Sequence, residues 1–457
     1  MTIAPYKAKI PERAIDVTET GQATRKESIV FDLDRDLEFN TAALQSYMFA
    51  AWEPVIYDAM VLAAAIEFAD LAIKRPTRGW ARRISLRIPV HDVARWNTPA
   101  VSGSLKDAAE FLTGDFWTVE FVERSTAVPT PQESFPFPHP TEAVIAYSNG
   151  LDSRAVAGLA GNTLGDKLVR VHIGRKAAWT PVVNGTPQPF IRVPYKFKIK
   201  LKNRETSARS RGFKFALISG LAAYLAGAKD ILIPESGQGA FGPALVLSAT
   251  HAHPDYRNHP LFAARMTRFL EALLGKPVHF AFPRLWHTKG QTLQEFAALP
   301  ERDTWQDTRS CWRDSRWSSV NNEHLQCGVC AACMLRRMSV HAAGLTEESG
   351  TYICTDLNED TLDKATHPDF TRRTAAFEQY AIAGTFHLDH MADMIRAESR
   401  PVIRRHAALT APALGIPKEE AEAQLVGMLE RHAAEWRNFV NDLGERSFVR
   451  KWTRISQ

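Results

Sequence analysis

Residues 143–158, "AVIAYSNGLDSRAVAG", carry a short apolar run into the start of a helix through a small polar turn. The run ends at Tyr147, and Asp152 and Ser153 stand where the helix begins. If the run is a strand of a parallel sheet, the helix directs unpaired backbone N–H groups and its positive dipole end at a ligand beyond the strand. The stretch therefore predicts an anion-binding turn. The alternative is an ordinary helix whose end amides are capped by Asp152 or Ser153.

Short apolar runs recur after this stretch, at 167–173 and 230–234, with helical segments such as 213–227 between them. Short apolar strands that alternate with helices are typical of parallel βαβ units covered on both faces. We therefore expect an α/β domain with a parallel sheet over 141–350.

A proline-rich segment, 126–143, separates this domain from an N-terminal region. That region has a helical stretch at 41–73 and strand-like runs at 82–90 and 115–124. This pattern predicts an N-terminal α+β domain.

The domain boundaries that follow place a partly flexible leader at 1–27 and the α+β domain at 28–140. The chain after 350 is dominated by helical patterns. We expect residues 351–457 to form a helical extension with little chemistry of its own.

The composition is that of an ordinary globular chain, since 45% of its 457 residues are hydrophobic and 23% are charged. No apolar run approaches the roughly 18 residues of a membrane span, and residues 1–28 lack the apolar core of a secretory signal. A net charge of +5 does not call for a nucleic-acid partner. Five cysteines in so long a chain indicate a reducing compartment, and the cytoplasm is the expected location.

Four of the five cysteines lie close together, at Cys311, Cys327, Cys330 and Cys333. A C-x-x-C-x-x-C run with one more cysteine upstream suits a tetrahedral thiolate site, and four thiolates leave no open position for chemistry. The pattern favours a structural zinc in a knuckle over 305–340. An iron–sulfur cluster and free buried thiols are the alternatives. Cys354 stands apart and is expected to be a core thiol.

The segment "SNGLDS" resembles the S-G-G-x-D-S loop of ATP pyrophosphatases, the PP-loop family, with an asparagine in place of one glycine. In that family the loop grips the pyrophosphate of ATP while a substrate oxygen attacks the α-phosphate. The resemblance implies binding of ATP and Mg²⁺, with catalytic roles for Asp152 and Ser153. The residues that it assigns to the nucleotide are Ser148, Asn149, Gly150, Leu151, Asp152 and Ser153.

The loop and the cysteines together resemble 7-cyano-7-deazaguanine synthase, the QueC family, over roughly 143–345. There C-x(n)-C-G-x-C-x-x-C-x-x-R carries a structural zinc, and the final arginine corresponds to Arg336. The resemblance does not extend to the N-terminal domain or the helical extension. QueC-like proteins with extra domains are known from bacterial anti-phage operons, the Qat system and type IV CBASS, and this chain resembles those.

Further site residues follow from the same resemblance. Arg211 lies in a segment similar to the family's R-N-x-x-F, with Gly212 in place of the asparagine, and Lys289 lies in one similar to P-L-x-x-x-x-K. The resemblance implies catalytic roles for both. Arg211 is expected to face a phosphate or a carboxylate, with a solvated arginine as the alternative. Lys289 is expected to neutralise phosphate charge as the transition state forms. His172 follows the second strand, where the family's backbone meets adenine.

The substrate side is expected in "ILIPESGQGAFGP" (231–243), through Glu235, Ser236 and Gln238. The family's Y-P-D-C-R element is only echoed, by "HPDYR" (253–257). This departure bears on which acceptor the protein uses.

The resemblance implies adenylation of a carboxylate, 7-carboxy-7-deazaguanine, with release of pyrophosphate and transfer of the acyl group to an amine. The extra domains favour a protein amine on an operon-encoded partner, with no nucleic-acid substrate and no membrane. The alternatives are a deazaguanine nitrile synthase that uses ammonia, a tRNA-modifying thiolase, and a degenerate nucleotide-binding subunit of a defence complex. A thiolase would need catalytic cysteines, and only Cys354 remains for that role.

Overall fold

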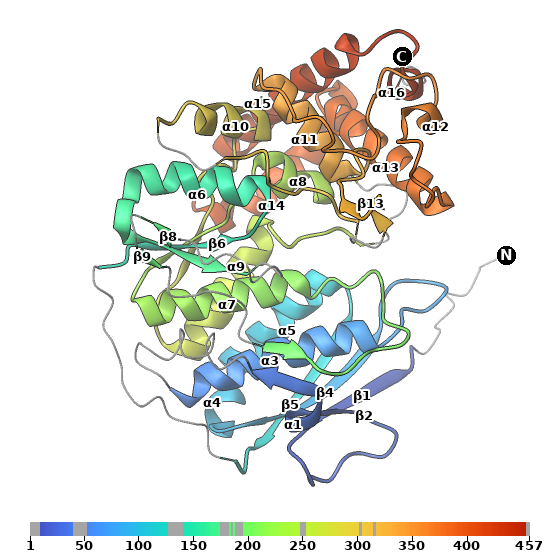
Figure 1. Cartoon of the computed structure of the whole chain (residues 1–457). Coiled ribbons are helices and arrows are strands. Elements are labelled where there is room, and N and C mark those ends of the chain that lie inside the picture. The colour runs from blue at the N-terminus through green and yellow to red at the C-terminus, as the bar shows by residue number, and fades with distance from the viewer. Residues whose placement is uncertain are drawn as a thin grey trace, which may run out of the picture.

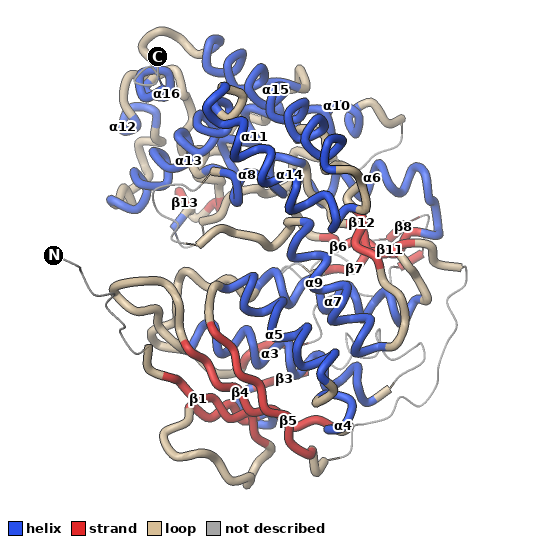
Figure 2. The backbone as a smooth tube through the Cα atoms, turned by 180° about the vertical axis from the view of Figure 1, so that it is seen from behind, coloured by secondary structure: helices blue, strands red, loops and turns tan. Residues whose placement is uncertain are grey.

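The structure is a computed structural model that describes residues 10–39, 53–126, 140–173, 182–183, 186–187, 195–246, 253–300, 304–313 and 317–453. It stacks in layers, with one parallel sheet at the N-terminal end, a layer of helices, a second parallel sheet, and a helical cap that includes the C-terminal region (Figures 1 and 2). Among the described helices, none combines the length and the apolar character needed to cross a bilayer.

The N-terminal sheet has the strand order β2-β1-β4-β5, and every neighbouring pair is parallel. Its strands are β1 (Glu12–Thr18), β2 (Ile29–Asp32), β4 (Arg83–Val90) and β5 (Phe116–Glu123). The strand-like runs expected at 82–90 and 115–124 correspond to β4 and β5. The expectation of a leader over 1–27 was wrong for residues 12–18, because β1 is an inner strand whose Ile15 and Val17 are buried in the core.

The second sheet has the strand order β12-β11-β6-β7 and is also parallel throughout. Its strands are β6 (Ala143–Tyr147), β7 (Leu168–His172), β11 (Asp230–Leu232) and β12 (His279–Ala281). The expected parallel sheet is confirmed, and β12 is an edge strand that the sequence pattern did not indicate. The carboxyl ends of these strands share one edge of the sheet, where a ligand site is expected.

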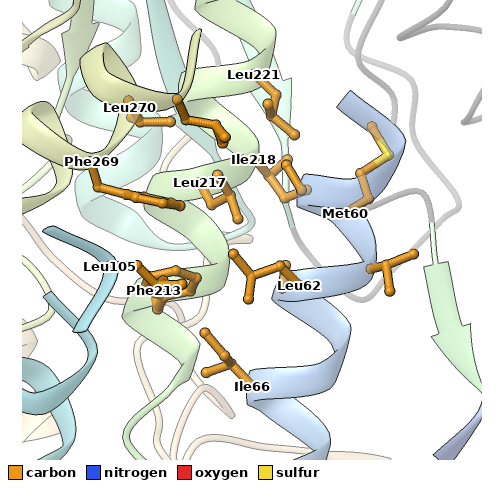
Figure 3. Packing of buried hydrophobic residues seen from close by; sticks show 14 of the residues in the cluster. Met60, Leu62, Ile66, Leu105, Phe213, Leu217, Ile218, Leu221, Phe269 and Leu270 are labelled. Atoms are coloured by element: carbon orange, nitrogen blue, oxygen red, sulfur yellow. The ribbon is translucent and has the colours of Figure 1, made fainter. Parts of the chain in front are cut away.

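Four helices lie between the two sheets: α3 (Pro54–Ala72), α5 (Pro99–Thr113), α7 (Arg211–Ala226) and α9 (Pro260–Leu274). Figure 3 shows Leu62 and Ile66 of α3 facing Phe213 and Leu217 of α7. A Cβ at Gly220 would lie 2.4 Å from a methyl group of Leu270, so glycine permits the close approach of α7 and α9. The expected α+β and α/β domains therefore share one apolar core.

The helical cap begins with α6 (Leu151–Leu164), α8 (Gly237–Leu245), α10 (Lys289–Ala297) and α11 (Ala331–Ala342). The expected C-terminal helices are present as α13 (Ala375–Asp393), α14 (Arg400–Leu414), α15 (Lys418–Asp442) and α16 (Phe448–Thr453). A Cβ at Gly384 of α13 would lie 2.4 Å from the Val329 carbonyl oxygen, inside the cysteine segment. The C-terminal region is thus packed directly on the centre of the molecule.

The remaining elements are short and connect the layers: α1 (Leu33–Asp36), β3 (Leu37–Phe39), α4 (Val93–Trp96), η1 (Gly165–Lys167), β8 (Val182–Val183), β9 (Thr186–Pro187), β10 (Tyr195–Phe197), β13 (Ser319–Val320), β14 (Glu323–His324), α12 (Leu362–Ala365) and η3 (Ala397–Ser399). Of these, β10 pairs with β3 antiparallel and ties the segment after β7 to the N-terminal region. The expected helix at 41–73 is observed from Pro54 onward, and its first part lies outside the described residues.

Candidate functional site

The turn between β6 and α6 is held by its two serines. Ser153 Oγ donates to the Ala146 carbonyl oxygen at 3.2 Å and accepts from the Ser148 backbone N–H at 3.1 Å. Ser148 Oγ lies 3.2 Å from Ser153 Oγ and accepts from the Gly150 N–H at 3.3 Å. These bonds fix a turn at the carboxyl edge of the sheet.

The N-terminus of α6 is left open by this arrangement. Its N-cap residue is Gly150, which has no side chain to offer the first amides. Ser153 turns back to Ala146, and Asp152 pairs with another residue, so neither serves as the cap. Four N–H groups at a helix start lack intrahelical partners, and the dipole favours an anion there. The geometry favours the anion-binding interpretation over the simple capped helix.

Asn149 does not use a left-handed backbone, because the described residues with positive φ do not include it. Its carbonyl oxygen instead accepts from the Arg309 N–H at 2.8 Å. A Cβ at Gly150 would lie 3.3 Å from Ser148 Oγ. Asparagine at 149 therefore needs no special conformation, and the tight position in the turn is occupied by glycine at 150.

Lys289 reaches this turn from α10. Its Nζ lies 2.6 Å from Asp152 Oδ2, and its side chain is almost fully buried. The other carboxylate oxygen of Asp152, Oδ1, is buried without a hydrogen-bond partner among the described residues. A buried ammonium and a half-used carboxylate at an open helix start suit a phosphate and a divalent cation.

Glu235 lies at the carboxyl end of β11. Its Oε2 accepts from Asn258 Nδ2 at 2.8 Å. Burial, reinforced by the negative charge of Asp152, raises the pKa of the Glu235 carboxyl to about 8. The neighbouring Ser236 is buried, and its Oγ has no hydrogen-bond partner among the described residues. Unsatisfied buried polar groups are costly, so these side chains are suited to a polar ligand.

The start of α7 is fixed by the N-terminal region. Asp70 of α3 accepts from the backbone N–H groups of Arg209 and Ser210 at 2.6 and 2.7 Å. Arg211 follows as the first helical residue, and its side chain is exposed, with its guanidinium 5.0 Å from the Phe215 ring centroid. Its charge therefore stands at a helix start, where a bound anion would offset the unfavourable dipole.

Gly212 has a steric explanation. A Cβ there would lie 2.7 Å from Arg257 Cβ and 3.0 Å from Arg257 Cα. Arg257 belongs to the "HPDYR" segment, and its Nε donates to Asp255 at 2.9 Å. The segment therefore occupies the space that an asparagine side chain would need.

Gln238 takes a different role from the one expected. Its Oε1 accepts from the Lys289 N–H at 2.7 Å, and its Nε2 lies 2.9 Å from His432 Nδ1. Both ends of the amide are thus used inside the protein, and the expected contact of Gln238 with the substrate base is not supported. Gln238 joins Lys289 to α15.

His172 ends β7 and pairs in register with Tyr147, so it lies at the same sheet edge as the turn. It is buried. The adenine contact expected at His172 stays a prediction, and residues 174–181, which follow it, lie outside the described residues.

The four clustered cysteines converge. Their four Sγ atoms all lie within 4.8 Å of one another, and they belong to Cys311, Cys327, Cys330 and Cys333. The Cys327 and Cys330 N–H groups donate to sulfur at 3.3 Å, as is favourable for thiolates. Gly328 has a φ of +82°, which glycine adopts without strain in the turn between two ligands. The cluster could hold a metal ion such as zinc.

Polar groups around the cluster orient it. Gln326 Oε1 accepts from the N–H groups of Ser310 and Cys311 at 2.7 and 3.2 Å, which fixes the distant cysteine beside the other three. Arg336 is fully buried, with its Nε 2.7 Å from Glu347 and its Nη1 2.8 Å from the Thr308 carbonyl. Cys354 is also buried, and burial raises its thiol pKa to about 12, which makes it a poor nucleophile.

The fold and this site define an α/β protein with an anion-accepting turn at the carboxyl edge of a parallel sheet and a four-cysteine cluster beside it. Residues 237–344 match the model of the family described as "Queuosine biosynthesis protein QueC". The matched range contains Lys289 and all four clustered cysteines and begins after the turn at 148–153. The match supports a QueC-like family. No curated protein and no solved structure matches the chain.

Sequence reasoning missed several residues at this site. Asn258 directly follows "HPDYR" and contacts Glu235. Thr288 forms a capping box with Gln291, and the T-x-x-Q spacing of that box was visible in the sequence. His432 and Glu435 gave no local signal, since they lie in a long helix far along the chain.

Proposed function

We propose that this protein is an ATP-dependent, QueC-like PP-loop enzyme that adenylates a carboxylate and transfers the acyl group to an amine. The observation that carries the proposal is the Lys289–Asp152 pair at the open start of α6, within a chain that matches QueC. A helix start with a lysine beside it binds phosphate. The same groups can stabilise charge that develops as pyrophosphate leaves.

The reaction needs little covalent chemistry from the protein. A carboxylate oxygen attacks the α-phosphorus, the bond to the bridging oxygen breaks, and pyrophosphate leaves. The amine nitrogen then attacks the acyl carbon, loses a proton to solvent, and AMP leaves. Asp152 would hold Mg²⁺, which supplies positive charge between the phosphates. The four cysteines would hold a structural Zn²⁺.

The carboxylate that we assign is 7-carboxy-7-deazaguanine, the substrate of the family that the chain resembles. Glu235 supports a purine-like ligand because a carboxyl with a pKa of about 8 is largely protonated at neutral pH. It then presents both a donor and an acceptor to a base edge. The buried hydroxyl of Ser236 lies next to it in the chain.

The amine that we assign is on a protein, an operon-encoded partner in an anti-phage defence system. The support is the "HPDYR" segment, which lies between the site and the N-terminal region. His253 of this segment stacks on Trp80 at 5.8 Å between ring centroids, while the adjoining Asn258 bonds Glu235. The segment and Asn258 lie inside the QueC match, whereas Trp80 lies outside it. A residue of the N-terminal region thus packs on the segment that leads to the Glu235 contact, as expected if the acceptor differs from ammonia.

The test is pyrophosphate release by the purified protein with and without 7-carboxy-7-deazaguanine. Release that requires the carboxylate supports the proposal, and a protein that binds ATP without turnover would instead be a nucleotide-binding subunit. Intact-mass spectrometry of co-expressed operon proteins tests the acceptor. A mass increase that depends on ATP and Asp152 is expected. Unmodified partners together with rapid nitrile formation would identify a deazaguanine nitrile synthase that uses ammonia.

A further inference from the structure

Helix α15 of the C-terminal region brings the half-buried carboxylate of Glu435 to the start of α10. The Thr288 hydroxyl donates a short hydrogen bond to Glu435 Oε1. A Cβ at Gly290 would lie 3.0 Å from the same oxygen, so glycine leaves room for the carboxylate. Thr288 immediately precedes Lys289, the residue paired with Asp152. The expectation that the extension has little chemistry of its own therefore needs revision.

The Thr288 hydroxyl is fixed by two hydrogen bonds, one that it accepts and one that it donates. Its Oγ1 accepts from the Gln291 N–H at 3.1 Å, as the cap of α10. A hydroxyl has one hydrogen, and that hydrogen is directed at Glu435. An acceptor at position 435 therefore stabilises the rotamer in which Thr288 caps the helix.

A second contact fixes the backbone of Lys289 itself. Gln238 Oε1 accepts from the Lys289 N–H at 2.7 Å, while Gln238 Nε2 lies 2.9 Å from His432 Nδ1 and 3.5 Å from Glu435 Oε2. Both partners of the Nε2 group are on α15. Two residues one turn apart on the same helix thus hold the cap and the amide of Lys289.

We propose that Glu435 is a positioning residue for Lys289, acting through Thr288 and Gln238. The inference rests on the proposed function, in which Lys289 stabilises phosphate charge. A lysine at the first position of a helix moves with the helix start, and a small displacement at a reacting centre has a large kinetic cost.

Glutamate at position 435 is less favourable for stability than a neutral side chain of the same shape would be. Burial raises the pKa of the Glu435 carboxyl to about 7. Arg431 on α15 and His341 on α11 line the same open cavity of about 350 Å³ as Glu435. His432 on α15 shares the Gln238 Nε2 group with it. A neutral isostere would avoid ionising this half-buried acid at pH 8. Glutamate thus lowers stability at that pH, while its two oxygens hold Thr288 and Gln238.

The experiment compares E435A and E435Q with E430Q, a matched control on the exposed face of α15. We expect E435A to lower kcat for pyrophosphate release by about tenfold to a hundredfold with little change in the KM for ATP. E435Q should unfold at the wild-type temperature or above at pH 8. It should still turn over more slowly, because its single amide oxygen can replace the acceptor for Thr288 or the one for Gln238 Nε2 but not both. E430Q should match the wild type in kcat and in unfolding temperature. Wild-type kcat in E435A, or a fall in kcat that merely follows the loss of folded protein, would overturn the inference.

A second readout separates this inference from the proposed function. The rate at which acetic anhydride acylates Lys289, followed by peptide mass spectrometry, does not require turnover. We expect faster acylation in E435A and T288V than in E430Q, because the lysine is held less firmly against Asp152. If the wild type releases no pyrophosphate but this difference is present, the proposed function fails and the positioning role stands. Equal acylation rates in all variants would contradict the positioning role itself.

Discussion

The backbone N–H of Arg309 donates to the carbonyl oxygen of Asn149 at 2.8 Å. Arg309 lies two residues before Cys311, and Asn149 lies in the turn that opens α6. The segment that carries the first thiolate therefore also supports the turn expected to bind ATP. Arg154 of α6 strengthens this contact, since its guanidinium donates to the Thr304 carbonyl at 2.5 Å. Loss of the metal should consequently reach the nucleotide site.

The first prediction concerns the cysteine cluster. Cys330→Ser should lose a bound zinc that the wild type holds at one ion per chain, because a complete thiolate set is needed for a closed tetrahedral site. Metal binding is coupled to local folding, so the free energy of unfolding should fall by several kcal/mol. ATP affinity should fall as well, through the Arg309–Asn149 contact. Elemental analysis, thermal unfolding and ATP titration measure the three effects.

Cys354→Ala is the matched control for this prediction. Cys354 is as buried as Cys327, Cys330 and Cys333 but is not among the four convergent thiols. This variant should keep its zinc and its ATP affinity. Its free energy of unfolding should fall only by the amount expected for truncating one small buried side chain. Iron in the wild type, or well-folded metal-free protein, would contradict the zinc assignment.

The second prediction concerns the turn. Asp152→Ala and Ser153→Ala should each reduce pyrophosphate release by at least about a hundredfold. Asp152 would hold Mg²⁺ and pairs with Lys289, and Ser153 fixes the turn that presents the helix start to the phosphates. Loss of a cap alone would cost only about 1 kcal/mol of stability. The control is Asp307→Ala, which removes a largely exposed partner of Arg154 and should leave turnover unchanged. A double variant of the turn that retained full activity in vivo would favour the non-catalytic subunit.

The third prediction concerns Gly212, where the similar family has asparagine. Gly212→Asn should destabilise the protein by about 1–3 kcal/mol, because its Cβ would meet the Arg257 backbone and side chain. Gly103→Ala in α5 is the opposite case, since a Cβ there meets nothing within 4 Å. It should stabilise the protein by about 0.5–1 kcal/mol. Chemical denaturation of both variants checks the pair, and a neutral Gly212→Asn would contradict the packing described for the "HPDYR" segment.

The fourth prediction is a pH dependence of stability that arises from His432. Burial lowers the pKa of this histidine to about 4 in the folded state, against about 6.5 unfolded. His432 therefore binds a proton less readily in the folded state than in the unfolded state. Its contribution to the free energy of unfolding is complete above about pH 6.5 and is lost as the pH falls toward 4. The structural reason is that His432 Nδ1 faces the amide nitrogen of Gln238 and must accept from it.

Denaturation of His432→Gln and the wild type across this pH range measures the effect. The stability difference between them should shrink by about 1.4 kcal/mol per pH unit below about pH 6.5. His390→Gln, on the exposed face of α13, should keep the wild-type dependence. A difference between His432→Gln and the wild type that does not change with pH would contradict a neutral, accepting His432.

Local sequence patterns predicted much of the core. The apolar runs at 143–147 and 167–173 became β6 and β7, and the run at 230–234 became β11, three residues long. Strands that are buried on both faces need continuous apolar residues, so their pattern is legible without knowledge of the rest of the chain. The cysteine spacing was similarly informative, because thiolates three residues apart can reach one metal ion through a single turn.

The N-terminal region shows where local patterns fail. Residues 12–18 contain charged residues, and the pattern did not separate them from a leader, yet they form an inner strand. Their charges are tolerated because of tertiary partners, as where Arg25 pairs with Asp16 at 2.6 Å and Ser28 also donates to that carboxylate. Such compensation is invisible in the strand's own sequence.

The sequence by itself determined the strand–turn–helix at Ser148–Ser153 and the four thiolates, because each depends on residues a few positions apart or on a distinctive residue type. Only the tertiary structure decided that Lys289 faces Asp152, that Gln238 turns to His432, and that Glu435 reaches Thr288. The last contact joins residues 147 positions apart. Packing of one helix against another sets such pairs, and no spacing rule within a single segment can encode them.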